Sequence, residues 1–193
     1  MNEKFLKQDG ISDSESKRAD EIRSKLLRDR IVFLGTPIDD SIANLVIAEL
    51  LFLEAEDPSQ DINLYINSPG GAVISSMAIY DTMNSIGPDV TTICVGQANG
   101  TAALLVASGM RGKRFALPHA RFQLVPMETS KNQLQTIELL EEMERLSNIF
   151  SDAFGKATRQ QPTRVRYDMQ MRLRLDANEA LNYGIIDALV SEQ

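Results

Sequence analysis

The sequence predicts one α/β domain with a mainly parallel core sheet that is flanked by helices. Short apolar runs alternate with longer segments of helical periodicity, and glycine-rich turns follow several of these runs. Strands that alternate with helices imply right-handed crossovers and therefore parallel strand pairs. The length of 193 residues, of which 43% are apolar and 24% charged, fits one such domain with a single core.

The first half of the chain predicts three steps from a strand to a helix. We expect buried strands at 30–35, 62–66 and 90–95. We expect the helices after them to be capped by Asp39, Asp40 or Ser41, to cover 73–86, and to cover 101–110. The last of these helices consists almost wholly of small and apolar residues, so it should be buried all round.

The second half predicts a different mixture of elements. We expect short strands at 114–117 and 121–125, an amphipathic helix over roughly 131–158, and a last strand at 185–190. Asp176 and Glu179 have the spacing of a capping box, and Gly184 ends the short helix that they begin. Residues 1–22 are polar and of mixed charge, which predicts a flexible N-terminal arm and a folded domain over 23–193.

Composition argues against several classes of function. The net charge of −7, without a long basic run, argues against nucleic-acid binding. No apolar run is long enough to span a bilayer and the polar N-terminus lacks a secretory signal, so we expect a cytoplasmic protein without a membrane partner. Cys94 is the one cysteine, and its apolar surroundings in the sequence predict a buried structural thiol. We expect neither a metal site nor a cofactor.

Two glycine-containing turns, 67–71 and 96–100, each follow a predicted strand and precede a predicted helix. Backbone N–H groups at such turns point outward and can hold a developing negative charge. Gly70 and Gly71 alone fit a tight structural turn equally well. The pairing of the two turns suggests an oxyanion hole.

Several consecutive segments are similar in sequence and in spacing to the motifs of one known family. They are 26–34, 51–58, Tyr65-Ile66-Asn67-Ser68-Pro69-Gly70-Gly71, 79–83, 96–98, 112–118 and 179–184. From about Leu26 to Val190 the chain therefore resembles the ClpP serine-peptidase family. The resemblance implies a crotonase-like fold and a Ser-His-Asp triad. It also implies seven-membered rings that stack around a chamber, with a protruding handle helix through which two rings meet.

The resemblance also locates the triad positions. In the family, the nucleophilic serine stands two residues after the alanine of Gly-Gln-Ala, and that position is Gly100 here. The histidine position corresponds to Val125 and the aspartate position to Arg172. A triad needs a nucleophile, a base that takes its proton, and an anion that orients the base. None of the three side chains can play its part.

The predicted function is therefore that of a noncatalytic subunit of the Clp protease core. Loss of one triad member typically lowers turnover by a factor of about 10⁴ to 10⁶. The chain is similar to the ClpR class of photosynthetic organisms, which implies mixed rings with active ClpP subunits, in the plastid stroma if the gene is plastid-encoded. His119 is the only histidine, and its place six residues before Val125 predicts the start of a strand rather than its catalytic end.

Two alternatives remain open. An active peptidase could use a displaced nucleophile, either Thr101 or a serine paired with a lysine, for example Ser75 or Ser108 with Lys131. A small acyl-CoA-binding enzyme of the wider crotonase fold could use the N–H groups of Gly71 and Thr101, which match the family's oxyanion hole, without any nucleophile. In a noncatalytic subunit the same N–H groups would remain as a vestigial hole.

Further departures from the family concern surfaces. The segment 126–133 lacks paired glycines, which puts substrate-strand binding and ring contact in doubt. In the cleft where Clp ATPases dock, Tyr65 remains aromatic, but Asn63 and Ser85 stand at positions that are normally aromatic. We expect weak ATPase docking at this subunit. Asp168 is expected on a solvated helix face, and half of the apolar stripe of the long helix is expected to bury against a partner subunit.

Overall fold

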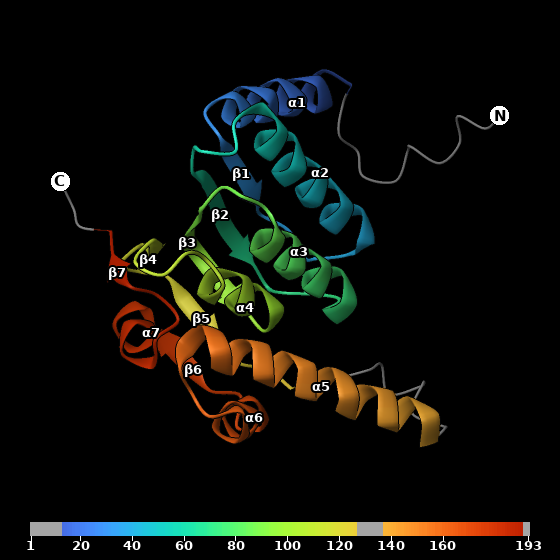
Figure 1. Ribbon diagram of the computed structural model, residues 1–193, viewed down its shortest axis with the longest axis vertical. Helices are drawn as coiled ribbons and strands as arrows, with labels where there is room; N and C mark the ends of the chain where they lie inside the picture. The colour runs from blue at the N-terminus through green and yellow to red at the C-terminus, as the bar shows by residue number, and fades with distance from the viewer. Residues whose placement is uncertain (1–12, 127–136, 191–193) are drawn as a thin grey trace.

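The computed structural model describes residues 13–126 and 137–190, with the arrangement drawn in Figure 1. Within these ranges there are seven helices and seven strands. The helices are α1 (Asp13–Arg28), α2 (Asp40–Glu56), α3 (Val73–Ser85), α4 (Thr101–Ala107), α5 (Ile137–Thr158), α6 (Pro162–Gln170) and α7 (Ala177–Tyr183). The strands are β1 (Ile31–Leu34), β2 (Ile62–Ser68), β3 (Val90–Asn99), β4 (Arg114–Ala116), β5 (Arg121–Gln123), β6 (Arg174–Asp176) and β7 (Ala188–Leu189).

The sheet is mostly parallel, as the sequence predicts. Its main path runs β1-β2-β3-β4-β7 through parallel pairs, while the far end of β3 pairs with β5. The one antiparallel pair joins β5 to β6. In Figure 1, α2, α3 and α4 lie together on one side of the strands. The predicted α/β class is confirmed.

Alternation along the strands decides which side chains form the core. Val32 and Leu34 of β1 and Leu64 and Ile66 of β2 are at most 1% exposed, whereas the residues between them are more accessible. All seven residues of α4 are buried, which confirms the helix predicted to be buried all round. Burial of these side chains supplies most of the favourable free energy of folding.

Helix ends follow local chemistry closely. Asp39 is the N-cap of α2 and accepts a hydrogen bond from the backbone N–H of Ile42 at 2.8 Å. Asp176 and Glu179 form the complete capping box of α7, and Gly184 ends that helix with a positive φ of 91°. These caps satisfy backbone groups that would otherwise lack partners. The α4 helix stops at Ala107, three residues before its predicted end.

Five elements differ from the sequence prediction. The β3 strand continues to Asn99 instead of ending at residue 95, because its last residues pair with β5. The α6 helix and the β6 strand are not among the elements predicted from the sequence. The predicted strand at 185–190 is reduced to β7, Ala188–Leu189. At the N-terminus, α1 starts at Asp13, within the range predicted as an arm, and residues 1–12 lie outside the described residues.

The α5 helix is buried at one end and exposed at the other. Phe150 and Phe154 are fully buried and their rings stack with centroids 5.6 Å apart. Ile137 and Leu140, near its start, are 75% and 56% exposed, and Figure 1 shows this end extending away from the strands. The part of the predicted helix before Ile137 falls outside the described residues. The described helix therefore protrudes with apolar side chains, Ile137 and Leu140, that are exposed among the described residues.

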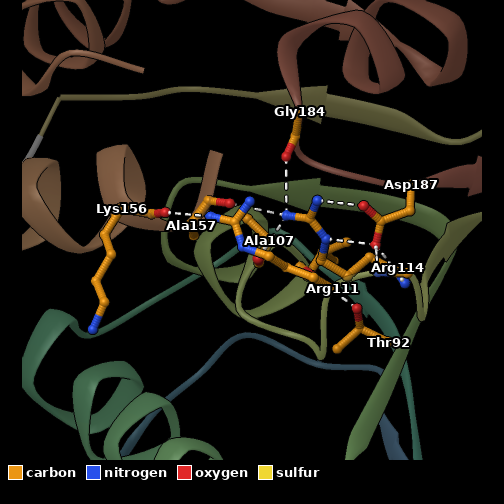
Figure 2. A network of polar contacts seen from close by, with 10 residues as sticks. Thr92, Ala107, Arg111, Arg114, Lys156, Ala157, Gly184 and Asp187 are labelled. Atoms are coloured by element: carbon orange, nitrogen blue, oxygen red, sulfur yellow. Dashed lines mark hydrogen bonds and ion pairs between the residues drawn. The ribbon is translucent and has the colours of Figure 1, made fainter. Parts of the chain in front are cut away.

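A buried arginine joins the C-terminal ends of three helices (Figure 2). Arg114 Nη1 donates to the carbonyl oxygens of Ala107, Ala157 and Gly184, each at 3.0 Å. The other side of its guanidinium donates to both oxygens of Asp187, at 2.8 and 2.5 Å. Arg114 is 4% exposed, so these bonds satisfy a charge that would be costly to bury alone. The node fixes α4, α5 and α7 against the sheet.

Cys94 is buried in β3. Burial raises the pKa of its thiol to about 12, although a backbone hydrogen bond with Gly96 acts in the opposite direction. At neutral pH it is therefore a protonated thiol without nucleophilic character. The predicted buried structural thiol is confirmed.

Candidate active site

The turn between β3 and α4 has the backbone form of a nucleophile turn. Gly100 lies between Asn99 and Thr101 with φ 52° and ψ −116°, a conformation that L side chains rarely adopt. Its N–H donates to the carbonyl oxygen of Gln123 at 2.7 Å, which holds the turn against β5. Hydrolases expose an attacking residue on a strained strand-to-helix turn of this kind. In this chain the residue at that place is Gly100, which has no side chain and therefore no atom that could attack a substrate.

Val125 lies directly against this turn. A Cβ added at Gly100 would come within 2.8 Å of the Cγ2 atom of Val125. The two positions are 25 residues apart in sequence, and the pairing of β3 with β5 brings them together. The structure thus places the predicted nucleophile and base positions side by side, with an apolar contact where a proton transfer would occur.

The third triad position, Arg172, lies next to β6 in the chain. The β5–β6 pair matches Gln123 with Arg174, and Leu124 donates its N–H to the carbonyl oxygen of Leu173 at 2.9 Å. Arg172 itself precedes β6, and its N–H donates to the carbonyl oxygen of Met169 at 3.0 Å. Arg172 has a positive φ of 51° and its side chain is exposed. Gly100 and Val125 are therefore adjacent, and Arg172 lies two residues before the strand that pairs with β5.

The two glycine turns also meet, as the oxyanion-hole prediction requires. A Cβ on Gly70 would lie 2.4 Å from the carbonyl oxygen of Asn99 and 3.4 Å from the backbone nitrogen of Thr101. The N–H of Gly71, however, donates to the hydroxyl oxygen of Thr101 at 3.1 Å. One of the two predicted N–H donors already has an acceptor within the chain.

A family model described as Clp protease matches residues 14–193, nearly the whole chain. This chain belongs to the Clp protease family. Membership supports a role in Clp proteolysis, and the mixed α/β fold with its mostly parallel sheet is consistent with the crotonase-like fold of ClpP.

Asp168 does not lie on a solvated face, so that prediction is wrong. It is 3% exposed and accepts hydrogen bonds from Arg164 Nε at 2.8 and 2.9 Å and from the hydroxyl of Tyr183 at 2.8 Å. Burial raises the pKa of the Tyr183 hydroxyl, and its bond to the Asp168 carboxylate raises it further. In this Clp family member Asp168 joins α6 to α7 and does not point to a second catalytic acid. The hydroxyl of Tyr183, seven residues past the end of β6 and on another helix, gave no sequence signal.

The other candidate nucleophiles and bases are separated from this locality or already engaged. Ser75 donates its hydroxyl to Asp40 Oδ1 at 2.5 Å, and Ser108 donates to the carbonyl oxygen of Leu104 at 2.6 Å. Lys131 lies outside the described residues. His119 is exposed between β4 and β5. It lies in the turn before β5, whereas Val125 follows the end of that strand.

At the predicted ATPase-docking position, aromatic and aliphatic side chains lie next to one another across four neighbouring strands. Tyr65 pairs in register with Phe33 on one side and with Ile93 on the other, and Ile93 pairs with Phe115. Phe33 is 46% exposed. Asn63 is partly exposed two residues before Tyr65, and the exposed Ser85 turns its hydroxyl back to the carbonyl oxygen of Thr82.

In residues 13–126 and 137–190, no cluster of three or more His, Cys, Asp or Glu could hold a metal ion. The same ranges contain no helix with both the length and the apolar character needed to cross a membrane.

A side chain at residue 100 is expected to destabilise the fold through Val125. Gly100→Ala should cost more stability than Gly112→Ala, because both glycines have positive φ but a Cβ at Gly112 meets nothing within 4 Å. Backbone strain of this kind costs about 1 to 3 kcal/mol, and overpacking adds to it. Urea denaturation measures the difference, which Val125→Ala should remove in a double-mutant cycle. Equal losses at the two glycines would contradict the contact.

Proposed function

We propose that this chain is a noncatalytic subunit of the proteolytic core of a Clp protease, of the ClpR-like kind. The observation that carries the proposal is the contact between Gly100 and Val125 at one strained turn, with Arg172 two residues before the strand that pairs with β5. A serine peptidase needs an alcohol, an imidazole and a carboxylate in this arrangement. The backbone of the turn has the shape of a nucleophile turn, but the reactive side chains are missing. A subunit that serves only in assembly would need the fold and not these side chains.

The exposed start of α5 supports an assembly role. Ile137, Leu140 and Ile149 leave apolar surface uncovered on a helix whose far end is anchored in the core. Apolar stretches of this kind on a protruding helix favour burial against another subunit. We propose that active Clp subunits of a mixed ring cover it. A Clp ATPase would then dock mainly on the neighbouring subunits, since Asn63 and Ser85 reduce the aromatic area beside Tyr65.

Labelling of the native complex tests the proposal. The tagged chain, purified from its own cells, is expected to run in native mass spectrometry as part of a large complex. A fluorophosphonate probe should then label a co-purifying subunit and leave this chain unlabelled, because the probe reacts with an activated serine. Pretreatment with phenylmethylsulfonyl fluoride controls for non-specific labelling. Stoichiometric labelling of this chain would sink its noncatalytic assignment.

A matched pair of variants tests the assembly surface. Leu140→Glu places a charge on the exposed apolar side of α5 and is expected to remove the chain from the complex. Glu141→Gln changes a neighbouring exposed residue on the same helix and should leave assembly intact. Assembly of both variants at wild-type level would exclude this face as the contact.

A further inference from the structure

The hydrogen bond between Gly71 and Thr101 joins two turns that are 30 residues apart in sequence. The N–H of Gly71 is one of the donors that the sequence analysis assigns to an oxyanion hole. The Thr101 hydroxyl oxygen accepts it at 3.1 Å, within ordinary hydrogen-bond range. An oxygen of the protein therefore occupies the position that a substrate carbonyl oxygen would take.

The Gly71 side of this contact is held rigidly. Ile38 donates its N–H to the carbonyl oxygen of Gly70 at 3.0 Å and accepts from the N–H of Ala72 at 2.8 Å, so both neighbours of Gly71 are fixed. A Cβ on Gly71 would lie 2.0 Å from the carbonyl oxygen of Ile38. The backbone has no room to turn the N–H of Gly71 elsewhere.

The Thr101 side is equally constrained. Thr101 is the first residue of α4, and its side chain is 4% exposed although the facing Gly71 is accessible. Its branched Cβ restricts rotation about χ1, which keeps the hydroxyl in place. A substrate oxygen would have to displace this hydroxyl before it could accept the hydrogen bond. Removal of one oxyanion-hole donor typically lowers turnover about 10²- to 10³-fold.

We propose that Thr101 closes the oxyanion hole from within. Its hydroxyl binds the N–H that would stabilise the tetrahedral intermediate, so the chain has lost its anion site as well as its triad. The inference deepens the proposed function, on which it rests, because it concerns the same site. It also changes an expectation from the sequence, since the vestigial hole is occupied rather than merely unused.

Amide exchange tests the contact directly in the full-length chain. In Thr101→Val, which keeps the shape of the side chain and removes the acceptor, the Gly71 amide should exchange about two- to tenfold faster by NMR. Thr101→Ser keeps the hydroxyl and should leave exchange unchanged. Thr92→Val removes another buried hydroxyl, which bonds the carbonyl oxygen of Val106, and should also have no effect at Gly71. An unaltered Gly71 amide in Thr101→Val would overturn the proposal.

Reconstruction of the triad tests the consequence. The variant Gly100→Ser/Val125→His/Arg172→Asp is compared with and without Thr101→Val for hydrolysis of p-nitrophenyl acetate. Removal of the hydroxyl should raise the rate by at least about tenfold, because the Gly71 donor becomes available. Equal rates in the two reconstructed proteins, zero included, would reject the closed hole. Failure of the proposed function would appear elsewhere, as probe labelling of the unaltered chain.

Discussion

The isolated chain is expected to cleave a short peptide at least about 10⁴-fold more slowly than a Clp subunit with an intact triad. The physical reason is that Gly100 offers no atom to attack and Val125 no atom to take a proton. Arg172 offers a positive charge in place of the carboxylate that would stabilise the protonated base, so it cannot assist the transition state. Steady-state hydrolysis by protein made in a host without Clp subunits measures the rate.

The control for this measurement is an intact Clp subunit whose serine is replaced by alanine. Its residual rate and that of this chain should be similar. A rate near that of the intact enzyme would favour the displaced-nucleophile alternative, and mass spectrometry of a trapped adduct would then identify the residue. Thr101 is a poor candidate because it is only 4% exposed and a substrate could hardly reach its oxygen. Calorimetry with an acyl-CoA separates the remaining alternative, for which binding without hydrolysis is the distinguishing result.

Local patterns predicted most of the helices and parallel strands because their signals are contained in short segments. Asp39 caps α2 through its own side chain, and the box formed by Asp176 and Glu179 is a contact three residues long. The extension of β3 and the existence of β6 depend instead on pairing with β5. Such pairing involves residues far apart in sequence, so neither strand could be found from its own residues.

In the candidate site, too, some features could be predicted from short segments and others depend on contacts between distant residues. The resemblance to the family located Gly100, Val125 and Arg172, and the structure places Gly100 next to Val125. The bond from Gly71 to Thr101 could not be predicted, because it depends on how two turns approach each other. The sequence did contain a partial signal for this bond, because Thr101, which carries a hydroxyl, directly follows Gly100 at the start of α4. Asp168 was misassigned for a related reason: its partner Tyr183 lies on a different helix.

Arg114→Met is expected to lower the free energy of unfolding by about 3 to 5 kcal/mol, since it removes one partner of a buried ion pair. The Asp187 side chain is 24% exposed, which favours the lower part of this range. The variant also leaves the carbonyl oxygens of Ala107, Ala157 and Gly184 without their shared donor. Urea denaturation followed by circular dichroism measures the loss.

Two comparisons separate burial from charge. Lys113→Met removes the ion pairs of the neighbouring residue with Asp61 and Asp89, all more than one-third exposed, and should change stability far less. The double variant Arg114→Met/Asp187→Leu should recover part of the loss, because no unpaired buried charge remains. A larger loss for Lys113→Met than for Arg114→Met would contradict the importance of the buried node.

The same pair makes stability depend on pH. Burial of Asp187 acts to raise its pKa, but hydrogen bonds and charge from Arg114, with the N–H of Gly112, together hold the pKa below its ordinary value. A carboxyl group with a lowered folded-state pKa stabilises the fold above its unfolded pKa of about 4, and this contribution disappears as pH falls through the folded value. The stability gap between wild type and Arg114→Met should therefore be constant near neutrality and narrow below about pH 4. A gap that widened on acidification would show that Asp187 is not held ionised by Arg114.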